Sequence, residues 1–306
     1  MAQWYNQKEK CVGTFRIKLL WWLYKIFGRH FAQIVIFFVV VFSYPFLKDA
    51  RRQANDFFKV LNNYQAKNKL KTTKPNVFKL IYNFALSMLD KLILGANKKH
   101  SDFLQIKQSP DFLEFQNVLN SGKGAIIIFS HIGNFEILGM NSDKVFKTRK
   151  LKITALVEGW SQSVYRSFFL SQQNTGRLSF FDVSKIDIST FEKLSSELTQ
   201  GNLIIMAGDR LSKRTPDKYF KEDILLKKCK LPSGVFQLST MLKAPVFFAN
   251  CIEANNKYIA EFKQPTCVDN EKKRGEHLAK EFSAFLEASV LQAPYQWYNF
   301  FEFFQE

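Results

Sequence analysis

The sequence predicts an α/β fold in which helices flank a mostly parallel central sheet, together with an N-terminal apolar helix that anchors the chain to a membrane. From residue 125 onward, short apolar runs alternate with segments of helical periodicity, as in parallel sheets covered by helices. Near the N-terminus, the stretch 31–47 contains no charged residue. We therefore divide the chain into an amphipathic and apolar anchor, residues 1–47, and one globular domain, residues 48–306.

The anchor begins with residues 1–30, in which basic side chains are interleaved with Trp and Tyr. Such rings and cations favour the headgroup layer of a membrane. The 17 residues of 31–47 are at the lower limit for a helix that crosses a bilayer. This stretch starts too late for a signal peptide and lacks a cleavage site. We expect a helix that lies in, or dips into, the inner leaflet; a true span and a buried core helix are the alternatives.

The pattern of residues 48–108 predicts helices with a strongly basic surface, most of it simply solvated. A buried strand is expected at 125–129, where the residues are apolar and mostly β-branched. Gly133 and Asn134 then allow a sharp exit from the strand and cap a helix that buries several of residues 135–140. This arrangement puts a polar turn directly after a buried strand.

Four later apolar runs predict further strands, and two amphipathic segments predict helices. The strands are expected at 152–159, 178–183, 202–210 and 244–253, and the helices at 188–201 and 271–292. In such a sheet, functional residues lie at the carboxyl ends of the strands. His131, Glu136, Asp209 and Arg210 all occupy such ends.

The charge of the chain favours an anionic partner. Its 44 basic and 27 acidic residues give a net charge of +17, which suits nucleic acid, an anionic membrane surface or an acidic carrier protein. The 33 Phe residues exceed what a stacking platform for nucleic acid needs, and they fit lipid contact better. We therefore expect a membrane surface and no nucleic acid as partner.

The four cysteines show neither a C-x-x-C pair nor a histidine at metal-ligand spacing. We predict no metal site. The simplest interpretation is four free thiols in a reducing compartment, with a disulfide bridge as the alternative. This places the globular domain in the cytoplasm.

His131 and Glu136 are the first candidates for catalysis. A histidine at a strand end can remove a proton from a hydroxyl when a carboxylate holds its ring in one tautomer. Residues five apart on a regular helix lie about 140° apart around its axis, so these two could not meet there. Across a strand-to-helix turn they can. The alternative is a structural histidine, the more common role of a single His near a strand end.

Several segments together resemble the late lipid A biosynthesis acyltransferases, a branch of the lysophospholipid acyltransferase superfamily. SHIGNFE, residues 130–136, is similar to the H-x-x-x-x-D/E signature of that superfamily. The Gly-Asp-Arg of 208–210 resembles the family's strand-ending D-Q or D-R element. The segment 228–249 resembles its P-x-G turn, helix and strand, and 293–304 resembles its P-x-Q-W-aromatic ending. The Gly-Asp-Arg form and the short span after it depart from the best-known lipid A enzymes.

The resemblance implies an acyltransferase at the cell inner membrane, with its catalytic domain on the cytoplasmic side. It would move a fatty acyl chain from acyl carrier protein, or acyl-CoA, to a hydroxyl of a lipid acceptor without a cofactor. The implied acceptor is a lipid A precursor; a lysophospholipid, an aminolipid or a pigment lipid is the alternative. A non-enzymatic basic protein that binds membranes is the rival from another class.

The same resemblance implies a role for each site residue. His131 would be the general base and Glu136 its orienting partner. The substrate-binding residues would be Asn134, Asp209, Arg210 and Gly234. Ser130 is no acyl-enzyme nucleophile in this interpretation, because the chain lacks a G-x-S-x-G motif.

Overall fold

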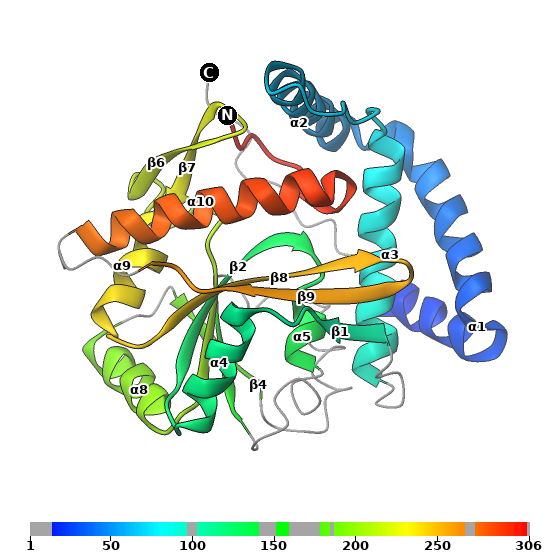
Figure 1. Cartoon of the computed structure of the whole chain (residues 1–306). Helices are drawn as coiled ribbons and strands as arrows, with labels where there is room; N and C mark the ends of the chain where they lie inside the picture. The colour runs from blue at the N-terminus through cyan, green and yellow to red at the C-terminus, as the bar shows by residue number, and fades with distance from the viewer. Residues whose placement is uncertain are drawn as a thin grey trace.

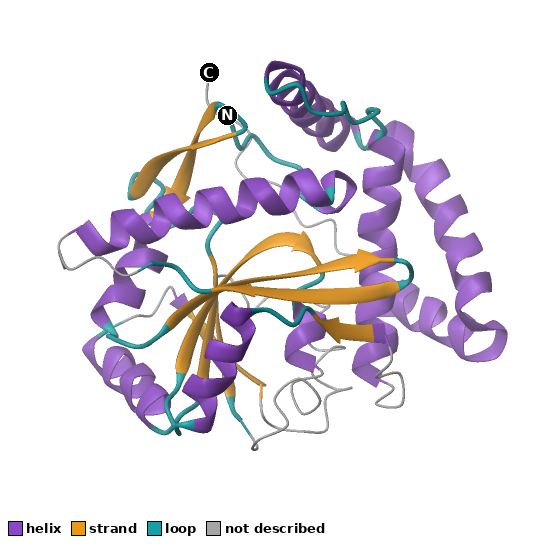
Figure 2. Cartoon of the chain, in the orientation of Figure 1, coloured by secondary structure: helices purple, strands orange, loops and turns teal. Residues whose placement is uncertain are grey.

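The computed structural model describes residues 14–96, 103–140, 151–158, 178–183, 187–266 and 273–304. In these residues the chain forms a seven-stranded sheet in the order β1-β9-β8-β2-β5-β3-β4, a separate two-stranded hairpin, β6-β7, and helices around both (Figures 1 and 2). The strands of the large sheet are β1 (Leu104–Ile106), β2 (Ala125–Gly133), β3 (Ile153–Val157), β4 (Leu178–Asp182), β5 (Leu203–Ala207), β8 (Val246–Ala254) and β9 (Lys257–Lys263). The hairpin strands are β6 (Tyr219–Ile224) and β7 (Lys227–Pro232).

The helices precede, connect and follow these strands. They are α1 (Thr14–Ser43), α2 (Lys48–Lys67), α3 (Val77–Ala96), α4 (Pro110–Asn120), α5 (Glu136–Met140), α8 (Ile188–Thr199), α9 (Ser233–Met241) and α10 (Arg274–Gln292), with short 3-10 turns at Tyr44–Phe46 and Pro294–Gln296. In the large sheet, neighbouring strands among β2, β3, β4 and β5 pair in parallel, as do β2 with β8 and β1 with β9, whereas β8 and β9 pair antiparallel. The separate β6–β7 pair is also antiparallel. The predicted α/β class with a mostly parallel sheet flanked by helices is confirmed.

Two apolar layers cover the two faces of the sheet, and the alternation of side chains along β2 shows how. Ile126 and Ile128 pack in the layer that contains Phe282 and Leu286 of α10. The residue between them, Ile127, belongs to the other layer, together with side chains of α4. Successive residues of a strand point to opposite faces, so an apolar run without alternation becomes a strand buried on both sides.

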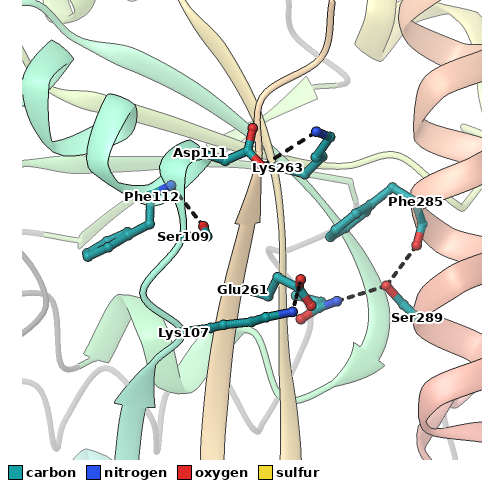
Figure 3. A network of polar contacts seen from close by, with 9 residues as sticks. Lys107, Ser109, Asp111, Phe112, Glu261, Lys263, Phe285 and Ser289 are labelled. Carbon is teal, nitrogen blue, oxygen red and sulfur yellow. Dashed lines mark hydrogen bonds and ion pairs between the residues drawn. The ribbon is translucent and has the colours of Figure 1, made fainter.

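Polar contacts at the sheet edge fix α4 and α10 in place (Figure 3). At the start of α4, the Ser109 hydroxyl accepts a hydrogen bond from the Phe112 backbone N–H at 3.1 Å, a standard N-terminal cap. Lys107, which follows β1, pairs with Glu261 of β9 at 2.6 Å. On the other face, Ser289 of α10 accepts from the buried Asn250 amide of β8 at 2.8 Å. Lys263 of β9 also pairs with Asp111 of α4 at 3.5 Å, so α4 and α10 are both tied to the β8–β9 pair.

The structure contains strands that the sequence analysis did not anticipate. The region 48–108, predicted as helices, contains α2 and α3 and also the short strand β1. The β8–β9 hairpin turns at Asn255 and Asn256, whose φ angles of 54° and 60° match a two-residue turn that favours asparagine. Every second residue of β9 is then buried, as expected for an alternating strand.

Helix α1 packs on α3 with one side and exposes apolar residues on the others. Ala32, Ile36 and Val40 are buried in the same apolar layer as α3. The helix kinks at Gly28, where φ is 78°. In the described part of the chain, 19–46 is the one helix long and apolar enough to cross a membrane, and 17% of its most apolar window is buried. The predicted apolar N-terminal helix is present, and it is not a buried core helix.

Gly133, at the end of β2, is required by the backbone. Its φ is 65°, and β2 changes register against β8 between Phe129 and Gly133. A Cβ at this position would lie 2.1 Å from the carbonyl oxygen of Cys251. The chain thus passes from the strand into the short helix that follows at a position where only glycine fits.

We expect Gly133→Ala to lower the free energy of unfolding by at least about 2 kcal/mol, because it adds both a left-handed backbone cost and a clash. Gly139→Ala is the matched control, since an added Cβ there meets nothing within 4 Å. It should change stability by less than about 1 kcal/mol. Urea unfolding of both variants measures the difference, and equal midpoints would contradict the prediction.

Candidate active site

His131 and Asp209 meet because their strands pair in parallel and in register. Phe129 of β2 lies opposite Ala207 of β5, so the residues two positions further along each strand also lie side by side. The Asp209 carboxylate accepts two hydrogen bonds from His131, one from the backbone N–H to Oδ2 and one from ring Nδ1 to Oδ1, each 2.8 Å long. One carboxylate therefore fixes both the backbone and the ring of the histidine.

This pairing assigns the tautomer of the ring. An ionised carboxylate only accepts, so Nδ1 carries the proton and Nε2 keeps a lone pair. The side chain of His131 is 31% exposed and that of Asp209 is 3% exposed. The ring is thus open to a reactant while the carboxylate behind it is sealed off.

Burial, helped by the positive charge of Arg210, favours the neutral form of the ring. Burial and then the positive charge of Arg210 lower the pKa of His131, and together they outweigh the opposing effect of Asp209. For Asp209, burial raises the pKa, but the hydrogen bonds from His131 and the charge of Arg210 bring it below its ordinary value. A neutral imidazole with an ionised carboxylate behind it is the form that acts as a general base.

The structure corrects the partner predicted for the imidazole, which is Asp209 and not Glu136. Glu136 begins α5, as expected, but its carboxylate accepts a hydrogen bond from Nζ of Lys91 at 2.6 Å. The physical reason is that Nδ1 can donate one hydrogen bond, and the Asp209 carboxylate accepts it. The nearly buried Lys91 in turn needs an anionic partner, and Glu136 provides it.

Asn134 lies inside the protein, which does not fit the predicted roles of helix cap and substrate contact. Its side chain is fully buried, and its amide donates to the carbonyl oxygen of Ser87 in α3 at 2.9 Å. Its backbone N–H donates to the Cys251 carbonyl at 2.7 Å. Asn134 therefore fastens the turn after β2 to α3 and to β8.

A buried polar chain continues from this turn to helix α1. The hydroxyl of Tyr258 in β9 lies 3.5 Å from the Asn134 amide and donates to Asp90 at 2.8 Å. Asp90 in turn forms an ion pair with Arg29 of α1 at 3.0 Å. Sequence reasoning missed Asp90 and Lys91, because it assigned the charges of this region to a solvated surface. The available signal was their position inside an otherwise apolar helical segment.

Arg210 contacts the C-terminal segment after α10. Its guanidinium lies 3.5 Å from the carbonyl oxygen of Tyr298 and 5.7 Å from the ring centre of Phe301. The backbone N–H of Tyr298 also donates to the carbonyl oxygen of His131 at 3.1 Å. The side chain of Trp297, 1% exposed, packs beside this contact in the core. The predicted role of Arg210 in binding an anionic group stays a prediction.

Gly234 does not belong to the cluster around His131 in the contacts described above. It is exposed in the first turn of α9, just after the buried Pro232. An added Cβ would meet nothing within 4 Å, so the backbone does not need glycine there. Its predicted place near a substrate stays untested.

Other polar groups near the site are set apart from it. Ser130 is 1% exposed and precedes His131 on a strand, so the two side chains point to opposite faces of the sheet. Cys229 and Cys251 are free and buried. Cys11 and Cys267 lie outside the described residues. Among the described residues, no group of three or more His, Cys, Asp or Glu side chains could hold a metal ion.

The sequence was compared with models of known protein families and with curated proteins, and nothing matches in either comparison.

The geometry predicts how the pKa of His131 responds to its two neighbours. Replacing Arg210 by Met removes a cation and should raise the pKa of the ring, whereas Asp209→Asn removes an anion and should lower it. NMR titration of the imidazole protons measures both shifts, and the His131→Ala spectrum assigns the signal among the four histidines. Shifts of the same sign in the two variants would contradict this account of the site.

Proposed function

We propose that the chain is a membrane-associated acyltransferase that moves a fatty acyl chain from an acyl thioester to a hydroxyl of a lipid acceptor. The observation that supports it most directly is the neutral, partly exposed His131 ring held by the buried Asp209 carboxylate. A second support is the resemblance of the segment around His131 to the lipid A acyltransferases. Because function depends on the site and not on the fold, the α/β sheet adds little by itself.

In the proposed reaction, Nε2 of His131 removes the proton of the acceptor hydroxyl as its oxygen attacks the thioester carbonyl. A C–O bond forms and a tetrahedral oxyanion results. When the oxyanion collapses, the C–S bond breaks, and the imidazolium returns its proton to the leaving thiolate. Asp209 stabilises the imidazolium between these steps. Atoms and protons balance without a further reactant.

Arg210 suits an anionic group in this scheme. The charge of Arg210 lowers the pKa of both His131 and Asp209, so the guanidinium lies close enough to act on the proposed reacting atoms. A guanidinium there can stabilise the oxyanion or bind a phosphate of the donor. The donor is acyl carrier protein, for which a chain of net charge +17 gives electrostatic steering, or else acyl-CoA.

The membrane part of the proposal rests on the exposed side of α1. Twelve large apolar side chains between Leu19 and Phe46 are exposed: Leu19, Trp22, Ile26, Phe27, Phe31, Ile34, Phe37, Phe38, Val39, Val41, Phe42 and Phe46. A patch of this kind usually marks a membrane or protein contact. Because α1 packs beside α3 and its Arg29 pairs with Asp90, we propose that it lies in the leaflet instead of crossing it. The proposed location is the inner membrane, with the catalytic residues on the cytoplasmic side.

The acceptor proposed from the resemblance is a lipid A precursor. A lysophospholipid, an aminolipid or a pigment lipid would use the same chemistry. A non-enzymatic basic protein that binds membranes would use α1 and the positive charge alone, and it would give no reason for the His131–Asp209 pair. The lipids that change when the gene is deleted, measured by mass spectrometry, identify the acceptor.

His131→Ala should reduce acyl transfer by about 100-fold to 10,000-fold, because general-base catalysis contributes that much. The assay follows labelled acyl groups from acyl carrier protein into extracted lipid. His277→Ala is the control, since His277 lies away from the site and contacts Thr266 and Glu281. It should leave the rate unchanged. Near wild-type transfer by folded His131→Ala protein would refute the mechanism.

Phe38→Asp combined with Phe42→Asp should weaken binding to anionic vesicles by at least about tenfold, since each exposed Phe that inserts contributes on the order of 2 kcal/mol. The two rings are 52% and 73% exposed, so the fold should tolerate the change. Ile188→Asp is the control, because Ile188 is 80% exposed at the start of α8. Co-sedimentation measures the binding. If the control weakens binding as much as the double variant, α1 is not the membrane contact.

A further inference from the structure

Glu136 carries a carboxylate that the proposed reaction does not use. Its side chain is 53% exposed, whereas that of its partner Lys91 is 8% exposed, and the two are joined by a 2.6 Å contact. One partner of this ion pair is therefore nearly buried, and the other faces solvent. A nearly buried cation holds a carboxylate whose remaining lone pairs are open to a ligand.

The charge of the Glu136 carboxylate acts on the groups that take part in the proposed reaction. Burial, Arg210 and Asp209 have larger effects on the pKa of His131, but the charge of Glu136 also acts on the ring. The same charge acts on the guanidinium of Arg210. Glu136 begins α5 three residues after Gly133, the last residue of the strand that carries His131, so its carboxylate and the base belong to the same strand-to-helix turn.

Lys91 keeps this carboxylate ionised. Partial burial raises the pKa of Glu136, but the charge and hydrogen bond of Lys91 bring it below its ordinary value. An ionised carboxylate only accepts hydrogen bonds, so its ligand must bring a donor. The phosphate groups of an acyl donor bring none and would be repelled.

We propose that Glu136 binds a second hydroxyl of the acceptor, next to the one that His131 deprotonates, so that the site selects headgroups with neighbouring hydroxyls, such as polyols and sugars. The inference rests on the proposed acyl transfer. A hydroxyl fits better than an ammonium group, because Lys91 already balances the charge of Glu136 and Arg210 adds a further positive charge nearby. Glu136 is thus a binding residue for the acceptor and not the orienting partner of the base.

The test compares two acceptors at a fixed concentration of acyl thioester. Dodecylglycerol offers two adjacent hydroxyls, and its deoxy counterpart offers the terminal hydroxyl alone. The wild type should prefer dodecylglycerol by about tenfold or more in kcat/KM, as expected for a charged hydrogen bond. Glu136→Gln should bring the two values within about threefold of each other. Asp209→Asn should slow both acceptors by the same factor and keep the preference.

A second variant tests the same inference without changing Glu136, in case Glu136→Gln disturbs folding. Lys91→Met removes the cation and should raise the pKa of Glu136, so the preference should fall as the pH is lowered, while that of the wild type stays flat. Wild-type transfer without a preference, or an unchanged preference in Glu136→Gln, would overturn this inference and leave the acyl transfer standing. Transfer to neither acceptor by the wild type would also overturn this inference, whereas the proposed function itself falls if extracted membrane lipid gains no label in the assay described above.

Discussion

The double hydrogen bond between Asp209 and His131 is the interaction on which the site depends. It requires β2 and β5 to be parallel, adjacent and in register, because only then do positions 131 and 209 lie side by side. The register in turn is held by side-chain packing, since a slip by one residue would move Ile126 and Ile128 into the layer that Ile127 occupies. The packing of the apolar core thus brings the side chains of His131 and Asp209 within hydrogen-bond distance of each other.

Helix α3 acts as the second support of the site. The neighbouring residues Asp90 and Lys91 are both nearly buried, and each has an oppositely charged partner, Arg29 and Glu136 respectively. A buried charge is tolerated only when it is paired, so each pair constrains where α3 lies against the turn after β2. Through Arg29, helix α1 is connected to the same turn. The apolar surface of α1 and the imidazole therefore belong to one continuous set of contacts.

Much of the fold could be predicted from the sequence, because five strands are apolar runs bounded by turn residues and the long helices have clear periodicity. The residues at the strand ends, His131, Asp209 and Arg210, were found for the same reason. The pairing among them was not, since which carboxylate reaches the ring depends on strand order, and strand order comes from packing between distant segments. Glu136 was the nearer choice along the chain, and Asp209 is the nearer one in space. The roles of Lys91 and Asp90 were missed because a charged residue in a helix is usually solvated.

The contact of Tyr298 with His131 also affects when the site can form during synthesis. The two residues are 167 positions apart, so at about 5 to 20 residues per second the ribosome makes them roughly 10 to 30 s apart. Helix α1 emerges long before either is in place. The exposed apolar surface of α1 is therefore synthesised while the histidine still lacks its last backbone partner, so the surface that we propose to contact a membrane exists before the site is complete.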